Sequence, residues 1–312
     1  MVAAIIIIIA ALIATAICWM LSKKAFDVAV KAKVPKEKVF SINEYDREGT
    51  DRSATYLNRD WLKNQVLIEH TIKSSEGLKL FGRMLFSIRP SKVWVVICHG
   101  FTGNGMNMGT YARHFHEKGY NVFLPDLRAC GKSEGAFLGM GWMDAKDLLL
   151  WIDHILAMEK NAKIVLTGGS MGGAATMMAT GYDLPENVVA AVADCGYTSV
   201  WEEFTYQLKK VFGLPRFPFM YLADGMAQKH AGYSFKEASS EAQLRKSKTP
   251  TLFIHGTADE FVPYYMLEQN YEACAAPEKE KLSVEGAGHG ASVEVEPALY
   301  WSTADQFLEK FL

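Results

Sequence analysis

Three side chains of the kinds that share one hydrolytic reaction stand far apart in this chain of 312 residues, namely Ser170, Asp259 and His289. A serine hydroxyl can attack a carbonyl carbon when an imidazole takes its proton, and a carboxylate can hold that imidazole in the correct tautomer. The sequence therefore predicts acyl transfer through a serine, provided that the fold brings the three groups together.

The surroundings of Ser170 favour its role as the nucleophile. The pattern Gly168-x-Ser170-x-Gly172 is typical of a nucleophile elbow, a turn so tight that it leaves no room for side chains two residues before and after the serine. The apolar run 163–166 predicts a buried strand before the turn, and residues 174–180 predict a helix after it. Alone the pattern is weak, because Gly and Ser also punctuate ordinary loops.

From residue 66 onward the chain alternates apolar strands with helices. The expected strands cover 66–72, 78–88, 93–98, 120–124, 163–166, 188–193, a run beginning at 249, and 281–284. The expected helices cover 111–118, 142–159, 174–180 and 296–312. Ser170, Asp259 and His289 each follow a different expected strand.

Three further patterns make the chain resemble a known family. The strand 93–98 runs into His99-Gly100-Phe101, the run His255-Gly256-x-x-Asp259-x-x-Val262-Pro263 follows another buried strand, and His289 lies in the Gly-rich loop 286–290. Together with the elbow, these patterns resemble the α/β-hydrolases, and among them the bacterial serine esterase and peptidase-like proteins that often carry an N-terminal membrane anchor. The resemblance covers residues 66–312. It implies an α/β fold with a mostly parallel eight-stranded sheet flanked by helices and a small cap inserted after strand 6.

The resemblance also implies roles for particular residues. Ser170 would be the nucleophile, Asp259 the acid and His289 the base of a catalytic triad, in the chain order that this family uses. The backbone N–H groups of Phe101 and Met171 would form the oxyanion hole. The resemblance implies no metal ion and no organic cofactor.

Four other polar residues near these motifs have mainly structural interpretations. His99 is expected to shape its loop. Asp194, at the end of strand 188–193, could in principle be the triad acid, although Asp259 is the better candidate. Asp126 and Arg128 are expected to tie down the turn 125–133 by hydrogen bonds and an ion pair, in a sequence that resembles a shortened form of the family's Asp-x-Arg-Gly-x-Gly-x-Ser turn.

The segment at about 200–247 is rich in aromatic residues and interrupts the alternation of strands and helices. It resembles the cap that covers the active site in this superfamily. Large aromatic side chains would form a water-poor pocket for an acyl or aryl group. The alternative is that most of these aromatics hold the small cap together.

The chain begins with about 20 uncharged, mostly apolar residues, Val2 to Leu21, followed by Lys23 and Lys24. This length and flank predict a transmembrane anchor over residues 1–22, and a cleaved signal peptide is the main alternative. Residues 23–62 are expected to form a tether with a short helix, and residues 63–312 the catalytic domain. The lysines after the span favour a cytoplasmic catalytic domain.

Composition excludes several other classes of protein. A formal net charge of -2 and the absence of a Lys/Arg-rich cluster on a nucleic-acid motif argue against a nucleic-acid partner. The five cysteines are scattered and form no Cys-x-x-Cys pair, so they are expected to be buried or free thiols rather than a disulfide or zinc framework.

The sequence as a whole predicts a serine hydrolase, more specifically a carboxylesterase that cleaves small or medium acyl or aryl esters and contacts the lipid bilayer through its first helix. One alternative is a serine peptidase acting on short or acylated peptides, and another is a non-catalytic binding protein on a hydrolase scaffold.

Overall fold

The computed structural model describes residues 1–36 and 50–312. Its centre is one eight-stranded sheet in the order β1-β2-β4-β3-β5-β6-β7-β8. The strands are β1 (Ile68–Lys73), β2 (Lys79–Leu85), β3 (Val93–Cys98), β4 (Asn121–Asp126), β5 (Lys163–Gly169), β6 (Val188–Asp194), β7 (Thr251–Gly256) and β8 (Lys279–Val284). The hairpin β1–β2 is antiparallel, β2 pairs antiparallel with β4, and every other pair is parallel.

The strand register places the ends of the parallel strands at one edge of the sheet. Cys98 pairs with Gly168, and Gly169 pairs with Asp194, so β3, β5 and β6 end side by side. Gly256 pairs with Val284 at the ends of β7 and β8. The loops that follow these five strands must therefore emerge together, and they carry all the candidate site residues.

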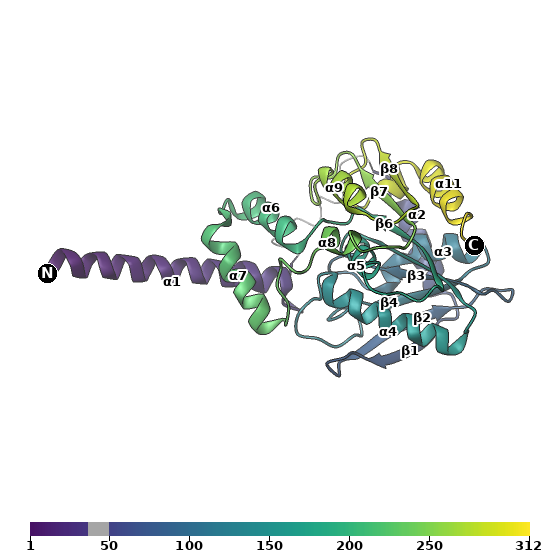
Figure 1. The fold of residues 1–312 in the computed structure, drawn as a ribbon, viewed down its shortest axis with the longest axis horizontal. Helices are drawn as coiled ribbons and strands as arrows, with labels where there is room; N and C mark the ends of the chain where they lie inside the picture. The colour runs from purple at the N-terminus through teal and green to yellow at the C-terminus, as the bar shows by residue number, and fades with distance from the viewer. Residues whose placement is uncertain (37–49) are drawn as a thin grey trace.

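Helices cover both faces of the sheet, because each face is apolar (Figure 1). One face packs against α4 (Trp142–Met158) and α5 (Met171–Ala179), with α8 (Ser240–Leu244) and α9 (Tyr265–Ala273) near β7. The other face packs against α2 (Ser53–Lys63), η2 (Gly105–Met108), α3 (Gly109–Glu117), α10 (Ser292–Val295) and α11 (Pro297–Leu308).

The segment between β6 and α8 forms two further helices, α6 (Val200–Phe212) and α7 (Arg216–His230). They stand clear of the sheet on the side from which the first helix projects (Figure 1). We call α6, α7 and the chain as far as α8 the cap. Phe235, Tyr233 and Phe219 are buried within it, so several of its aromatics hold it together, as the alternative interpretation expected.

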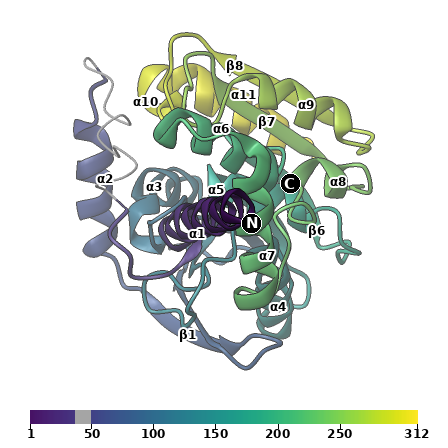
Figure 2. The same ribbon diagram turned by 90° about the vertical axis from the view of Figure 1, so that its left-hand side faces the viewer.

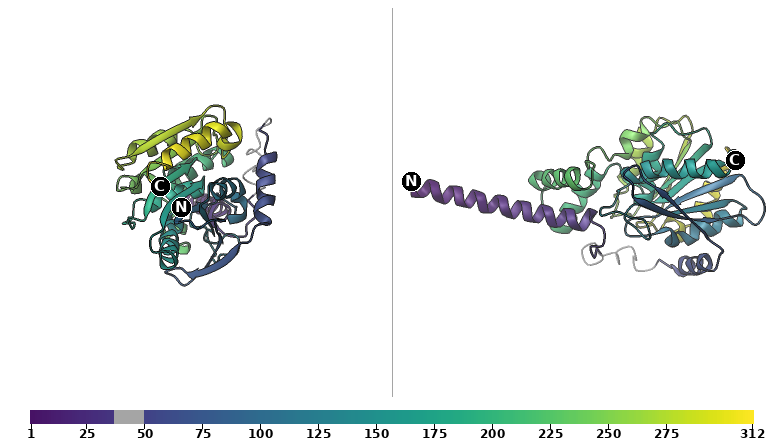
Figure 3. Two further views of the ribbon diagram at one scale, coloured as in Figure 1. Left: turned by 90° about the vertical axis from the view of Figure 1, so that its right-hand side faces the viewer. Right: turned by 90° about the horizontal axis from the view of Figure 1, so that it is seen from below.

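The first helix, α1 (Val2–Val30), is long and apolar enough to cross a membrane, a property that a signal sequence would share. It projects away from the domain, and the carboxyl terminus lies at the opposite end of the molecule (Figure 3). The helix does not end near residue 22, where the expected anchor ends. It continues to Val30 because Phe26 and Val30 are buried, and seen end-on its root lies against α7 (Figure 2).

The fold predicted from the sequence is confirmed, including the strand count, the mostly parallel sheet and the insertion after the sixth strand. The expected tether falls partly on residues 37–49, which lie outside the described residues. All five cysteines are free, as predicted.

Candidate active site

Ser170 occupies the sharp turn between β5 and α5. Its backbone has φ 57° and ψ -121°, the strained conformation of a nucleophile elbow. A Cβ atom on Gly172 would lie 2.2 Å from the carbonyl oxygen of Cys98, and one on Gly168 would lie 2.6 Å from the backbone of Gly172. Both glycines are therefore sterically required. Gly169 is not, because a Cβ there would meet no atom within 4 Å.

The structure brings Ser170, His289 and Asp259 into one hydrogen-bonded line. Ser170 Oγ lies 2.8 Å from His289 Nε2, and His289 Nδ1 lies 2.7 Å from Asp259 Oδ2. A carboxylate can only accept, so Nδ1 carries the proton, and Nε2 of the neutral ring is free to accept the serine proton. This geometry is that of a nucleophile, a general base and a group that orients the base.

Asp259 is held on both of its oxygens. Oδ1 accepts hydrogen bonds from the backbone N–H groups of Phe261 and Val262 at 2.9 and 3.0 Å. Oδ2 lies 3.0 Å from His255 Nε2 as well as near His289. Burial by itself would raise the pKa of Asp259, but the two histidines outweigh it and hold the pKa well below its ordinary value. The carboxyl group therefore stays ionised.

His255 belongs to the sequence motif around Asp259, and the structure shows its contacts in the site. Its Nε2 lies 3.0 Å from both Asp259 Oδ2 and the carbonyl oxygen of Val262. Both partners accept, so Nε2 must donate, and the ring stabilises the Asp259 loop through the same carboxylate oxygen that contacts His289.

The loop after β3 lies beside Ser170. A Cβ on Gly100 would be 3.4 Å from Ser170 Cβ and 4.0 Å from its Oγ. Phe101 and Met171 line the same cavity as Ser170, and Met171 is the first residue of α5, where helix N–H groups have no partner within the helix. The two residues expected to form the oxyanion hole therefore flank the nucleophile.

His99 shapes this loop, as expected for a structural residue. Its Nε2 accepts from the N–H of Leu127 at 2.9 Å, so Nδ1 carries the proton and donates to the carbonyl oxygen of Gly100 at 2.8 Å. Burial lowers the pKa of His99 to about 4, which keeps the ring neutral.

Asp126 and Arg128 both form buried ion pairs, although not with each other. Asp126 Oδ1 pairs with Arg83 at 2.9 Å, and Arg128 pairs with Asp147 at 2.8 Å and with Glu76 at 2.9 Å. The expected structural role is supported, with partners from β2, α4 and the β1–β2 turn that local sequence could not reveal.

Asp194 is buried at the end of β6 and accepts a hydrogen bond from Tyr111 Oη at 2.9 Å on Oδ2. Its backbone oxygen accepts from the N–H of Ser170 at 2.8 Å. Burial raises the pKa of Asp194 to about 6 in spite of the Tyr111 hydrogen bond. It supports the elbow, while Asp259 is the carboxyl group in contact with His289.

Comparisons with known proteins agree with this architecture. Residues 93–221 match the family model described as alpha/beta hydrolase fold. The esterase Pf2001 of Pyrococcus furiosus superposes with a TM-score of 0.65 at 21% identity, over 79% of this chain and 92% of that one. The chain therefore has the α/β-hydrolase fold.

Two further proteins are similar to this chain. The uncharacterized protein YqkD of Bacillus subtilis is 29% identical over 220 residues, 69% of this chain and 70% of its own length. The acylaminoacyl peptidase of Pyrococcus horikoshii has a TM-score of 0.61 at 18% identity, over 82% of this chain and 43% of that one. The structural likeness to the peptidase shows a shared fold.

The protein has two different cavities at Ser170. The first lies beneath the cap, encloses about 20 Å³, and is lined mainly by apolar side chains that include Phe101, Met140, Phe204, Phe261 and Val262. We call it the apolar slot. Its lining and narrowness suit an acyl or aryl group.

The second cavity opens on the other side of Ser170 and His289 and has a volume of about 420 Å³. We call it the polar cavity. It is lined by the loop after β3, by α2 and α3, and by Asp194 and Glu294. Asp194 Oδ1 and Glu294 Oε2 are buried and have no hydrogen-bond partner among the described residues. Such carboxylate oxygens can accept hydrogen bonds from a polar or cationic group.

Glu203 is a site residue that sequence reasoning missed. It lies on α6 in the wall of the apolar slot, and its Oε1 accepts from Gln207 Nε2 at 3.0 Å. Burial raises its pKa to about 8, so the carboxyl group is neutral at pH 7. No sequence signal could have found it, because only the tertiary structure buries this face of α6 over Ser170.

Cys195 lies close to the triad, and its sulfur, Asp259 and His289 offer ligand atoms within 4.8 Å of one another. These groups fit a metal ion poorly. Asp259 and His289 are already hydrogen-bonded to each other, and burial raises the pKa of the Cys195 thiol well above its ordinary value. A metal would require the thiolate.

Proposed function

We propose that the protein is a serine hydrolase that cleaves carboxylic esters of small or medium acyl or aryl substrates, with Ser170 as nucleophile, His289 as base and Asp259 as the group that orients it. The observation that carries this proposal is the line of hydrogen bonds from Ser170 Oγ to His289 Nε2, 2.8 Å, and from His289 Nδ1 to Asp259 Oδ2, 2.7 Å.

In this mechanism His289 takes the Ser170 proton as Oγ bonds to the ester carbonyl carbon. The oxyanion accepts hydrogen bonds from the backbone N–H groups of Phe101 and Met171, an arrangement in which one donor is worth about 3 to 4 kcal/mol. His289 then gives its proton to the departing alcohol oxygen, and the acyl group remains on Oγ. Water, deprotonated by His289, adds to the acyl carbon and releases the acid, which regenerates Ser170.

The two cavities divide the substrate between them. The acyl group would occupy the apolar slot, and the alcohol part would face the polar cavity, since Ser170 lines both. Their chemical difference makes this orientation more favourable than the reverse, because an apolar group gains most where water is excluded.

The test is turnover of 4-nitrophenyl acetate and butyrate by the full chain. Ser170→Ala should lower kcat by roughly a millionfold. Ser302→Ala, an exposed hydroxyl on α11, is the matched control and should leave turnover unchanged. Equal activity of Ser170→Ala and wild type would exclude the proposal, and so would failure of wild type to react with a fluorophosphonate.

A serine peptidase acting on short or acylated peptides is the second candidate. The buried oxygens of Asp194 and Glu294 favour it, because carboxylates in the polar cavity could hold a substrate amine. Comparing the turnover of an ester with that of its matching amide separates the two. Preference for the amide would replace the esterase proposal.

We also propose that α1 is an uncleaved membrane anchor, with residues 63–312 as a catalytic domain on the cytoplasmic side. Its mean hydropathy of 2.8 and the absence of burial over the apolar window support the anchor. Protease treatment of intact cells tests the orientation. Digestion of the domain from outside would reverse it. If cells that express the full chain release a soluble form from which the apolar segment has been cleaved, the uncleaved anchor is excluded.

A further inference from the structure

We infer that the protein takes the acyl chain of its substrate from the bilayer that holds α1, along an apolar passage between α1 and the cap that leads to Ser170. The substrate class is then esters of long-chain fatty acids carried in a membrane. This inference rests on the proposed esterase function and extends the expected acyl length.

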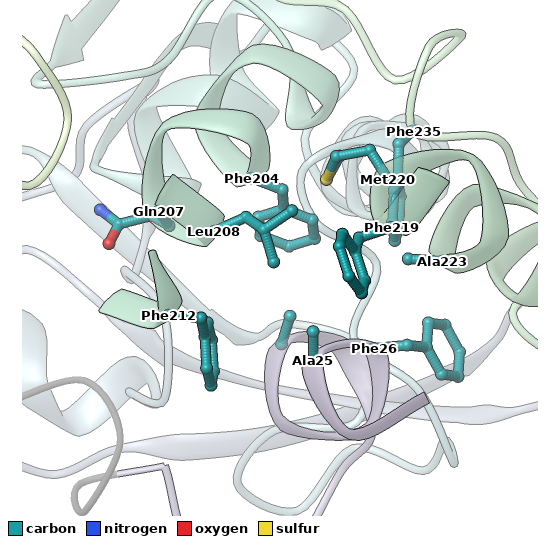
Figure 4. Close-up of a pocket in the computed structure, with 11 residues that line it drawn as sticks. Ala25, Phe26, Phe204, Gln207, Leu208, Phe212, Phe219, Met220, Ala223 and Phe235 are labelled. Carbon is teal, nitrogen blue, oxygen red and sulfur yellow. The ribbon is translucent and has the colours of Figure 1, made fainter. Parts of the chain in front are cut away.

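A second apolar cavity lies where α1 meets the cap, and we call it the root cavity (Figure 4). Its walls come from three helices, with Ala25 on α1, Leu208 and Phe212 on α6, and Phe219 and Ala223 on α7. In Figure 4 the side chain of Ala25 faces the gap that the aromatic side chains surround. Such a lining stays free of water and accepts hydrocarbon.

The root cavity and the apolar slot share two wall residues, Phe204 and Gln207. Gln207 is fixed, because its Nε2 donates to Glu203 and, at 2.7 Å, to the carbonyl oxygen of Phe261. Phe204 is half-buried and packs edge-on against Phe235 with ring centroids 5.0 Å apart. Rotation of the Phe204 ring would thus join the two spaces into one passage.

The size of the two spaces decides the shape of the occupant. The root cavity encloses about 30 Å³ and the apolar slot about 20 Å³. A compact aryl group cannot extend from one of these narrow spaces into the other, whereas a single unbranched hydrocarbon chain can. Each methylene group that leaves water contributes about 0.8 kcal/mol, so a longer chain gains more from the passage than a short one.

The root cavity lies close to the expected membrane surface. Ala25 follows Leu21, the last residue of the apolar run, by four positions, which is about 6 Å along a helix. The cap stands on the side from which α1 projects (Figure 1), and Trp19 shares a recess with Leu222 of α7.

The cap also presents aromatic side chains that suit a membrane surface. Phe217 is 74% exposed and Tyr221 is 50% exposed, both on α7. Amphipathic and aromatic side chains of this kind collect at the boundary between lipid and water. A fatty acyl chain leaving the bilayer would therefore meet the root cavity before it met bulk water.

The test uses the full chain in phosphatidylglycerol vesicles, with 4-nitrophenyl acetate and 4-nitrophenyl hexadecanoate as substrates. Ala25→Phe fills the root cavity and should lower the hexadecanoate-to-acetate ratio of kcat/KM by at least about tenfold. Ala14→Phe, which adds the same side chain to an exposed position of α1, should leave the ratio unchanged. An unchanged ratio in Ala25→Phe would overturn the inference.

A second variant tests the inference if Ala25→Phe does not fold. Phe212→Ala widens the root cavity and should shift the preferred acyl chain to greater length, and no shift would overturn the inference.

Hexadecanoate in the same vesicles as the protein should also react faster than hexadecanoate in separate vesicles, and equal rates would exclude the bilayer as the source. If wild type hydrolyses acetate but none of these effects occurs, only this inference fails. If acetate is not hydrolysed, the proposed function fails.

Discussion

The two sides of Ser170 differ in size and in chemistry. The apolar slot beneath α6 encloses about 20 Å³, whereas the polar cavity beside α2 and α3 has about 420 Å³ and contains two buried carboxylate oxygens without partners among the described residues. One side excludes water around a hydrocarbon, and the other leaves room for hydrated groups. Under the proposed esterase function, this difference assigns acyl specificity and alcohol specificity to separate parts of the fold.

The largest expected effect is the loss of activity in a variant of the candidate triad. It should be equal for esters that differ in their acyl part and for esters that differ in their alcohol part, because both cavities serve the same three residues. Asp259→Asn keeps the shape but removes the charge that orients His289, and it should lower kcat by about ten thousandfold for every ester. Steady-state kinetics with two acyl lengths and two alcohols measure this. Glu260→Gln, the neighbouring exposed carboxyl group, is the control and should stay near wild type. A loss of kcat confined to one class of ester would contradict a catalytic centre that all these esters share.

The second effect concerns the elbow that joins the two sides. Gly172→Ala places a Cβ 2.2 Å from the carbonyl oxygen of Cys98, so backbone must move, and we expect about 3 kcal/mol or more of lost unfolding free energy. Gly169→Ala is the matched control, since it meets open space. Denaturant unfolding and fluorophosphonate labelling measure both. Similar stability of the two variants would show that the elbow is not tightly packed.

The third effect is a pH dependence of acyl-length preference, which the apolar slot controls in the proposed function. Glu203 is neutral below its raised pKa of about 8 and ionised above it, so alkaline pH places a charge in the apolar slot. The ratio of butyrate to acetate turnover should therefore fall severalfold as pH rises through about 8, and Glu203→Gln should remove this dependence.

The same group predicts a dependence of stability on pH. The folded state holds the Glu203 proton more tightly than an unfolded chain with the ordinary pKa of 4.5, so its contribution to stability is lost as pH rises from about 4.5 through about 8. Melting temperatures of wild type and Glu203→Gln should diverge over this range. Parallel curves would mean that Glu203 is not buried as a neutral acid.

The smallest effect tests the polar side. Glu294→Gln removes the charge of one buried carboxyl group while Thr55 can still donate to it, as it now does to Oε1 at 2.6 Å. We expect KM for a choline ester to rise about fivefold, the value of one modest polar interaction, with no change in acyl-length preference. A changed acyl preference would show that the two sides are not independent.

Sequence alone determined the fold and the identity of the candidate triad, for a physical reason. Strand periodicity and the glycines that the elbow requires at 168 and 172 are local features. The order of Ser170, Asp259 and His289 can be read directly along the chain. Parallel strands then end at the same edge of the sheet, so the loops that carry these residues meet there. These signals need no knowledge of distant contacts.

Tertiary structure decided everything that depends on which surfaces meet. The partners of Asp126 and Arg128, the neutral state of Glu203 and the continuation of α1 to Val30 all depend on packing against other elements of the fold. Burial and its electrostatic consequences are properties of a packed site rather than of a residue. For that reason the two different sides of Ser170 became visible only once the cap, α2 and the root of α1 were in place.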